Sequence, residues 1–423
     1  MACTYQSTST ALQSRFKQFM AATGYCMVLI AMTNCSIAGT LEKPVSERQA
    51  FIQTEANDTI HPWVIAKAED GGYLVAGEIG VSAGIIKTDG QGKMLWQYST
   101  YAHQTPSYPY KEAMYRGIVS MPDGSIWACG SMPILPGYEQ KGLLTHLDGN
   151  GRLIEERLLA PLGTRLVYLL GCAKWESNVV VVGSVTRFPK EKLRPGKLTY
   201  PRNSYWVIVL DPEGKVKWGK EIPTPDFDPI GGINGTVLLT VGHNLVFCMD
   251  NGAPNTVTEF LSINRSGEVQ ARRKLEGVFR LVRPVRNDGR LQALGWGFKD
   301  HSLVVTTFDR NLREIQTVRD KRPPSFLPRV VYRLPDQSYV FFGSSVHRFG
   351  EEFKSAVVHM NGALKNEQEM DLDGDFSDDG SIWAATPAHQ PDEFVAARIF
   401  FKADHRGDIS GRHGAVLNFI KIK

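Results

Sequence analysis

A short segment recurs along the chain, and this internal repeat limits the possible folds more than any other feature of the sequence. The first copy, DGGYLVAG, begins at Asp70 and ends at Gly77, seven residues after the aspartate. Further copies run from Asp123 to Gly130, from Asp288 to Gly295 and from Asp336 to Gly343, with a looser one from Glu176 to Gly183. Because Asp and Gly form tight turns, each copy predicts a turn followed by an apolar strand.

A second repeated element follows the first and places another turn between two apolar stretches. Its six copies read KTDGQGKMLW, HLDGNGRLIE, VLDPEGKVKW, INRSGEVQAR, FDRNLREIQT and HMNGALKNEQ. In two of them a tryptophan, Trp96 or Trp218, lies seven residues after the turn aspartate, Asp89 or Asp211. The two repeated elements together predict units of four short strands.

Pairing the two elements gives seven units, about 45 to 65 residues apart. Their first turns are expected near Gly71, Gly124, Ser177, His243, Gly289, Gln337 and Gly380. The last unit is assigned because Trp383 follows Asp379 by four residues, as Trp127 follows Asp123. A β-helix needs shorter repeats and a sandwich does not repeat, so the period predicts an all-β chain forming a single β-propeller. Seven four-stranded blades are expected over residues 39–423. Six or eight blades are the alternatives, because the repeat is poorly defined at the two ends of the chain.

The first unit, DGGYLVAG followed by IIKTDGQGKMLW, resembles the DGGY-type β-propeller repeats of exported bacterial proteins. The match loosens in later units, although the periodicity covers most of residues 60 to 410. The resemblance implies a propeller fold and an extracytoplasmic bacterial setting. It implies no shared activity and no catalytic residues.

Propellers close by pairing strands from both ends of the chain, which removes an open sheet edge. The candidate closing strands are Phe51–Thr54 near the start of the repeats and Val416–Ile422 at the end of the chain. The second alternates apolar and polar residues, as a half-buried strand does. The sequence does not tell which of them joins the last blade.

Residues 1–38 are typical of a secretory signal that precedes the propeller. Arg15 and Lys17 lie ahead of the apolar run Met20–Met32, and small residues stand at Ser36 and Ala38. This order of charge, apolar run and small residues predicts export to the periplasm or cell envelope. The alternatives are an uncleaved anchor, a buried helix or lipid attachment at Cys35, where the preceding Asn34 fits a lipoprotein signal poorly.

Composition argues against nucleic-acid binding and against a disulfide-bonded scaffold. Lys and Arg exceed Asp and Glu by 48 to 44, so the net charge of +4 gives no reason to expect nucleic-acid binding. Cleavage after Ala38 leaves the three cysteines Cys129, Cys172 and Cys248, each in an apolar stretch. An odd number in an exported protein argues against a disulfide framework and favours buried free thiols.

The sequence contains no recognisable catalytic or cofactor motif. The residues that could suggest one are better explained by structural roles. The repeated aspartates are assigned to turns. Asp371–Asp379 alternates oxygen side chains like a calcium loop, but Phe376 and Ile382 occupy the positions that need Gly and Glu. The arginines between Phe279 and Arg290 are interpreted as part of an ordinary half-exposed strand. No metal, no cofactor and no catalytic residue is therefore predicted.

Two insertions outgrow the repeat, and such loops are where propellers usually differ in function. The first, from Tyr98 to Tyr115, is rich in tyrosine, which suits protein interfaces and sugar stacking. The second, from Arg187 to Arg202, has a local charge of +5 and suits an acidic protein, an anionic glycan or anionic lipid. The residues predicted to contact a partner are Tyr98, Tyr101, Tyr108, Tyr110, Arg187, Lys190, Lys192, Arg194, Lys197 and Arg202. The alternatives are a loop packed over its own blade and a solvated excursion.

The sequence thus predicts a monomeric, non-catalytic propeller of the bacterial cell envelope that binds another protein. One specific form is a periplasmic immunity or inhibitor protein that blocks a toxic enzyme. A propeller that binds or degrades glycans is the competing hypothesis. Clustered carboxylates in the central channel would favour the enzyme, whereas a channel filled by apolar residues, with exposed tyrosine and basic loops, would favour the binder. A structural assembly factor is the third hypothesis.

Overall fold

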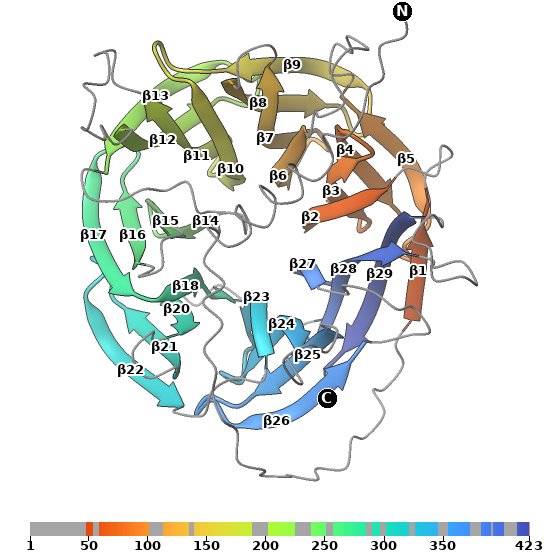
Figure 1. Cartoon of the computed structure of the whole chain (residues 1–423), viewed down its shortest axis with the longest axis vertical. Helices are drawn as coiled ribbons and strands as arrows, with labels where there is room; N and C mark the ends of the chain where they lie inside the picture. The colour runs from red at the N-terminus through yellow and green to blue at the C-terminus, as the bar shows by residue number, and fades with distance from the viewer. Residues whose placement is uncertain are drawn as a thin grey trace, which may run out of the picture.

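The computed structural model describes residues 48–53, 59–100, 113–134, 139–187, 202–224, 238–250, 257–284, 290–296, 302–320, 326–345, 354–372, 382–390, 392–401 and 413–422. Within these ranges the chain contains strands and no helix, and the strands form blades around a central axis (Figure 1). Seven antiparallel groups of four strands account for the blades, numbered here from the N-terminal side. The predicted seven-bladed propeller is therefore confirmed.

In each of the first three blades the chain runs from the innermost to the outermost strand. Blade 1 contains β2 (Ile60–Lys67), β3 (Tyr73–Ile79), β4 (Ser82–Thr88) and β5 (Met94–Ser99). Blade 2 contains β6 (Met114–Ser120), β7 (Ile126–Ile134), β8 (Glu139–Leu147) and β9 (Leu153–Leu159). Blade 3 contains β10 (Leu166–Trp175), β11 (Asn178–Arg187), β12 (Arg202–Leu210) and β13 (Val216–Pro223).

The next three blades repeat this order, with one short additional strand. Blade 4 contains β14 (Leu238–Val241), β15 (Asn244–Asp250), β16 (Val257–Ile263) and β17 (Val269–Glu276). Blade 5 contains β18 (Val278–Leu281), β20 (Leu291–Trp296), β21 (Leu303–Phe308) and β22 (Glu314–Asp320). Blade 6 contains β23 (Phe326–Arg333), β24 (Tyr339–Ser345), β25 (Lys354–Met360) and β26 (Asn366–Asp371), and β19 (Arg283–Pro284) pairs in parallel with β23.

Blade 7 closes the ring with strands from both ends of the chain. Its inner strands are β27 (Ile382–Pro387), β28 (Glu393–Phe401) and β29 (His413–Lys421), and its outermost strand is β1 (Arg48–Ile52). β1 pairs antiparallel with β29, with Ala50 opposite Leu417. Both candidate closing segments therefore take part, and they pair with each other.

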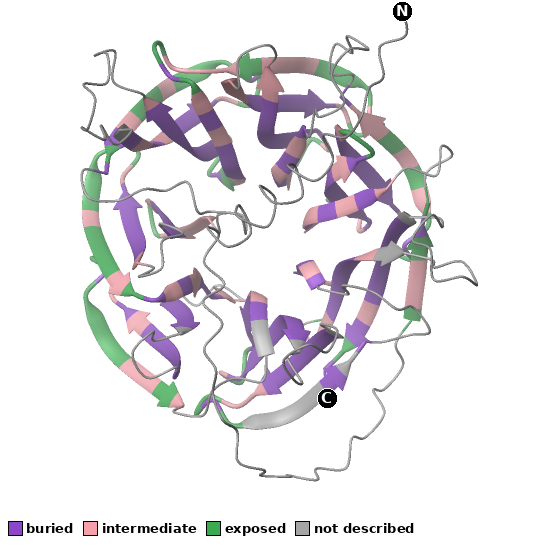
Figure 2. Cartoon of the chain, viewed as in Figure 1, coloured by how far each residue is buried: buried purple, intermediate pink, exposed green. Residues whose placement is uncertain are grey.

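Apolar clusters lie between the blades, one at each junction of neighbouring blades. Seven such clusters occur among the described residues, and one of them joins Ile52 of β1 and Val395 of β28 to Ile65 of β2. Figure 2 shows that the middle strands of the blades are mostly buried, whereas the outermost strands carry exposed residues. Because burial lies between blades, each blade depends on both neighbours for stability.

The repeated turns owe their shape to side-chain acceptors. In the β4–β5 turn, the Asp89 carboxylate accepts hydrogen bonds from the backbone N–H groups of Gln91 (2.8 Å) and Lys93 (2.9 Å). The corresponding residues that accept in the same way are Asp148, Asn264, Asp309 and Asn361. These contacts confirm the structural role predicted for Asp89 and Asp148.

These outer turns also explain the two repeated tryptophans. Gly151 of the β8–β9 turn lies so close to Trp96 of β5 that a Cβ would come within 2.6 Å of the indole, and Gly267 approaches Trp218 in the same way (2.8 Å). Where the preceding outer strand has Ala271 in place of a tryptophan, Leu312 fills the space at the glycine position. Leu312 adopts a φ of 59°, so burial of its side chain offsets the backbone strain.

The prediction for the first turn of the seventh unit is wrong. The sequence predicts this turn near Gly380, which lies outside the described residues. Trp383 lies in β27, the innermost strand, so the first turn of blade 7 follows β27, where the Ala388 N–H donates to the Glu393 carbonyl (2.8 Å). Trp383 is thus equivalent to Trp63 of β2, not to Trp127 of β7. The turn motif SDDGSIW misled because its apolar residues begin an inner strand.

Candidate functional site

The innermost strands of the seven blades surround a central cavity of about 310 Å³. Each of β2, β6, β10, β14, β18, β23 and β27 contributes lining residues. Pockets of this size class bind small molecules, and propellers assemble them from several blades. The cavity is therefore the first candidate for a binding site.

Five inner strands have a β-bulge, and in four of them the extra residue lines the cavity; in β10 the extra residue, Leu170, packs in the core instead. The strand registers skip Trp63, Arg116, Arg329 and Trp383, which lie at β-bulges of β2, β6, β23 and β27. A bulge leaves its extra residue unpaired and redirects its side chain relative to the strand alternation. All four residues line the cavity.

These four bulge residues form one continuous stack across blades 6, 7, 1 and 2. The Arg116 guanidinium lies 3.7 Å from the Trp63 ring centroid, and that of Arg329 lies 4.7 Å from Trp383. The two indoles meet edge to face, with centroids 4.6 Å apart. Stacking uses the guanidinium faces, which leaves the N–H donors in the guanidinium plane for hydrogen bonds.

The cavity is strongly cationic. Its lining includes the six basic residues Lys67, Arg116, Lys174, Arg280, Arg283 and Arg329, and no carboxylate among the residues described. Asp250 balances one of these charges through an ion pair with Arg280 (2.9 Å), and Glu78 lies near Arg116 and accepts from the Trp63 indole (3.0 Å). Burial lowers the pKa of Arg116 to about 10, against the opposing effect of Glu78, so the guanidinium stays charged at neutral pH.

Two of the remaining cations have uncharged hydrogen-bond partners. The Lys67 ammonium donates to the Ala388 carbonyl (3.4 Å), and Arg283 donates to the Tyr332 hydroxyl (3.4 Å). Lys174, at the end of β10, is exposed and lines the same cavity. Lys67, Lys174 and Arg283 have no carboxylate partner within the described residues, so their charge is available to an anionic ligand.

Both insertions predicted from the sequence leave the propeller on one face. The β4–β5 and β8–β9 turns share the face opposite to the insertions. Gly151 of the β8–β9 turn packs against Trp96, which lies in β5 close to the β4–β5 turn. The connections β5–β6 and β11–β12 join the other ends of antiparallel strands, so both lie on what we call the loop face. The strand ends from which the two insertions leave therefore lie on the same side of the molecule, whereas residues 101–112 and 188–201 are outside the description.

The predicted bounds of the first insertion, Tyr98 and Tyr115, are wrong, because Tyr98 belongs to β5 and Tyr115 is a buried residue of β6. Tyr98 turns toward blade 2. Its hydroxyl donates to the Glu156 carboxylate (2.8 Å), which also accepts from Thr100 (2.7 Å). Burial and this carboxylate raise the pKa of the Tyr98 phenol. The hydroxyl therefore joins neighbouring blades, and contact between Tyr98 and a partner stays a prediction.

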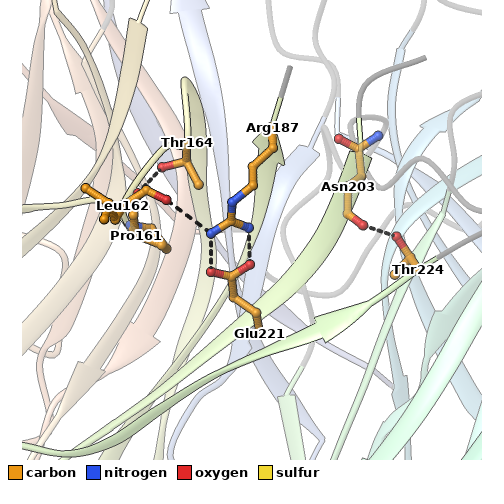
Figure 3. Close-up of polar contacts among 7 residues, drawn as sticks. All are labelled: Pro161, Leu162, Thr164, Arg187, Asn203, Glu221 and Thr224. Atoms are coloured by element: carbon orange, nitrogen blue, oxygen red, sulfur yellow. Dashed lines mark hydrogen bonds and ion pairs between the residues drawn. The ribbon is translucent and has the colours of Figure 1, made fainter. Parts of the chain in front are cut away.

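Arg187, at the start of the second insertion, is held by its own blade (Figure 3). Its guanidinium forms a bidentate pair with Glu221 of β13, one contact measuring 2.6 Å, and donates to the Leu162 carbonyl (3.4 Å). On the same blade, the Thr224 hydroxyl donates to the Asn203 carbonyl (2.8 Å). These contacts fix the base from which the basic insertion extends.

Most of the predicted partner-contacting residues lie outside the described residues. They are Tyr101, Tyr108, Tyr110, Lys190, Lys192, Arg194 and Lys197. Arg202 begins β12 and pairs with Arg187 across the ladder. The calcium-like stretch is also outside the description from residue 373 to 381.

The cysteines remain free thiols in the described part of the chain, with Cys129 and Cys248 buried and Cys172 half-buried beside the cavity. No group of three His, Cys, Asp or Glu side chains suited to a metal occurs among the residues searched. Within the same residues, no helix has the length and apolar character needed to cross a membrane.

Sequence reasoning missed the stacked residues and the cavity arginines. Arg280 was interpreted as part of an ordinary strand, whereas it lines the cavity. A usable signal existed, because Trp63, Arg116 and Arg329 each lie seven residues before the turn aspartates Asp70, Asp123 and Asp336. Aligning the units on those aspartates would have shown large cationic and aromatic residues at one position.

No family model and no curated protein matches the sequence. Similar solved structures include hydrazine synthase from Kuenenia stuttgartiensis, with 11% identity, a TM-score of 0.49, and 88% of this chain and 97% of that chain covered. The α-L-arabinofuranosidase Arb93A from Fusarium graminearum, solved with an iminosugar inhibitor, has 10% identity, a TM-score of 0.45, and coverage of 90% and 98%. The Dos1 propeller has 8% identity, a TM-score of 0.44, and coverage of 89% and 94%. Likeness at this level transfers no activity, substrate or partner to this chain.

Proposed function

We propose that this chain is a non-catalytic, protein-binding β-propeller of the bacterial cell envelope, and that its partner docks on the loop face. The observation that carries the proposal is that the strand ends from which both insertions leave lie on that face. A tyrosine-rich loop and a basic loop on one side combine contact area with charge, as protein interfaces do.

The chemistry of the cavity supports binding over hydrolysis. Glycoside hydrolysis requires two carboxyl groups on either side of the scissile bond. The described lining of this cavity is cationic, and the nearby Asp250 and Glu78 already interact with Arg280 and with Trp63. This arrangement favours recognition of a negatively charged group.

An immunity or inhibitor protein is the specific form of this function that the basic insertion supports best. A basic loop over the mouth of an enzyme with an acidic active site would attract the enzyme and block its substrate. Export by the N-terminal segment, residues 1–38, would place the chain where it meets such enzymes. Binding of an anionic glycan or lipid surface is the alternative that the same charge allows.

The test is capture of a partner from envelope and secreted fractions, with the chain from Gly39 onward as bait. The matched bait has residues 188–201 replaced by a short Gly-Ser linker, and its thermal unfolding is compared with that of the parent chain. We expect a stoichiometric protein to bind the parent and to be lost from the variant, with unfolding temperature unchanged. Capture of glycan, hydrolysis of envelope glycans, or equal capture by both baits would contradict the proposal.

A further inference from the structure

We propose that the central cavity is a binding site for a small polyanion that carries two or more oxyanion groups, such as carboxylates or phosphates. The inference goes beyond docking of a protein on the loop face and does not depend on it. Its basis is the convergence of six cationic side chains, from blades 1, 2, 3, 5 and 6, on one cavity.

Bringing several cationic side chains together is energetically unfavourable, and the propeller fold does not require it. Like charges around a confined cavity repel one another, and burial disfavours the charged form of Arg116. Blade 7 shows that an inner strand can line the same cavity with Ala384, Ala385 and Thr386. Cationic residues that line the cavity from five other blades are therefore explained best by a ligand of opposite charge.

The geometry also indicates the kind of anion. Arg116 and Arg329 are oriented by stacking on Trp63 and Trp383, and an oriented guanidinium binds a carboxylate or phosphate through two parallel hydrogen bonds. Arg283 lies on β19, beside blade 6, and Lys174 lies in blade 3, so a single anionic group would not engage all the cations. The ligand therefore carries several oxyanion groups.

The size of the cavity limits the ligand to a small molecule. A volume of about 310 Å³ lies at the lower end of the range for small-molecule pockets. A folded protein does not fit into a space of this size. A small ligand in the cavity and a protein on the loop face can therefore bind at the same time. The two sites are thus separable by experiment.

The test is isothermal titration calorimetry of the full chain at constant ionic strength, with citrate as the carboxylate probe and pyrophosphate as the phosphate probe. We expect at least one probe to bind at a single saturable site, and the preferred probe identifies the oxyanion chemistry. R283Q and K174Q should each weaken that binding about tenfold or more, because each removes a charge-assisted hydrogen bond. K215Q, which removes an exposed lysine from the β12–β13 turn, should leave it unchanged.

Three results would overturn the inference. They are the absence of saturable binding by both probes, equal weakening in K215Q, and full binding retained in both R283Q and K174Q. Because Arg283 is half-buried, its variant is accepted only if its unfolding temperature matches that of the parent; the exposed Lys174 then supplies the test if R283Q fails to fold. Capture of a protein partner by the chain from Gly39 onward is a separate experiment. A negative calorimetry result therefore does not bear on whether a protein docks on the loop face.

Discussion

At the scale of single residues, His146 shows how inter-blade packing creates a pH dependence. Its imidazole stacks on Trp127 with ring centroids 3.9 Å apart, and neither ring nitrogen has a hydrogen-bond partner in the described structure. Burial lowers the pKa of His146, and Arg157 lowers it further, against the opposing effects of Asp123 and Glu155. The folded protein therefore keeps His146 neutral at a pH where the unfolded chain is protonated.

This linkage predicts a loss of stability on mild acidification. The unfolded chain binds the proton below its pKa of about 6.5, so the stability due to neutral His146 is full above that pH and falls as the pH approaches the folded-state value. H146F keeps a ring on Trp127 but cannot titrate. We expect the fall in unfolding temperature from about pH 7.5 to about pH 5.5 to be smaller in H146F than in the parent. An identical fall in both proteins would contradict the assignment.

At the scale of elements, the outer turns pair a small residue with a large neighbour from the preceding blade. Gly151 and Gly124 allow a matched comparison, because both have a positive φ, 80° and 84°. A Cβ on Gly151 would lie 2.6 Å from Trp96, whereas nothing lies within 4 Å of a Cβ on Gly124. The two glycines therefore differ mainly in packing between blades.

We expect G124A to cost about 1 kcal/mol, the backbone penalty of an alanine in this conformation. G151A should cost about 1 to 3 kcal/mol more, because Trp96 must also move. Urea unfolding of both variants measures the difference. Equal free energies of unfolding for the two variants would show that the turn does not pack tightly against the neighbouring blade.

The elements also show how far sequence reasoning reaches. The six second-half turns were predictable because Asp89, Asn264 and their counterparts leave a local signature of acceptors and glycines. The seventh first turn was not, because residues 388–393 of blade 7 contain no Asp-Gly pair and SDDGSIW imitates one elsewhere. Bulges such as the one at Trp63 depend on pairing with a neighbouring strand, so a single unit gives no sign of the cavity stack, and only an alignment of the units on their turn aspartates reveals the shared position.

At the scale of the whole molecule, the ring is held closed by a strand from the other end of the chain. β1 is the outermost strand of blade 7, and Ile52, 2% exposed, joins the cluster between blades 7 and 1. Phe51, the preceding residue, is 53% exposed. Closure therefore depends on alternate side chains of one short strand.

We expect I52D to destabilise the protein by about 3 to 5 kcal/mol, because a buried apolar side chain is replaced by a charge without a partner. F51D, on the exposed side of the same strand, should cost about 1 kcal/mol or less. Thermal unfolding of the two variants provides the comparison. Similar unfolding temperatures for I52D and the parent would contradict closure by β1.

We propose that charge in the basic insertion, rather than charge in general, recruits a protein partner. Two charge reversals of equal size on blade 3 separate these possibilities: K190E/K192E/K197E in the insertion, and K215E/K217E/K220E on the turn and strand at the outer edge. The most direct measurement is the dissociation constant of the captured partner for the two triple variants and the parent. Our account predicts a rise of about a hundredfold or more for the insertion variant and little change for the outer-edge variant. Equal rises for both, or none for the insertion variant, would contradict it.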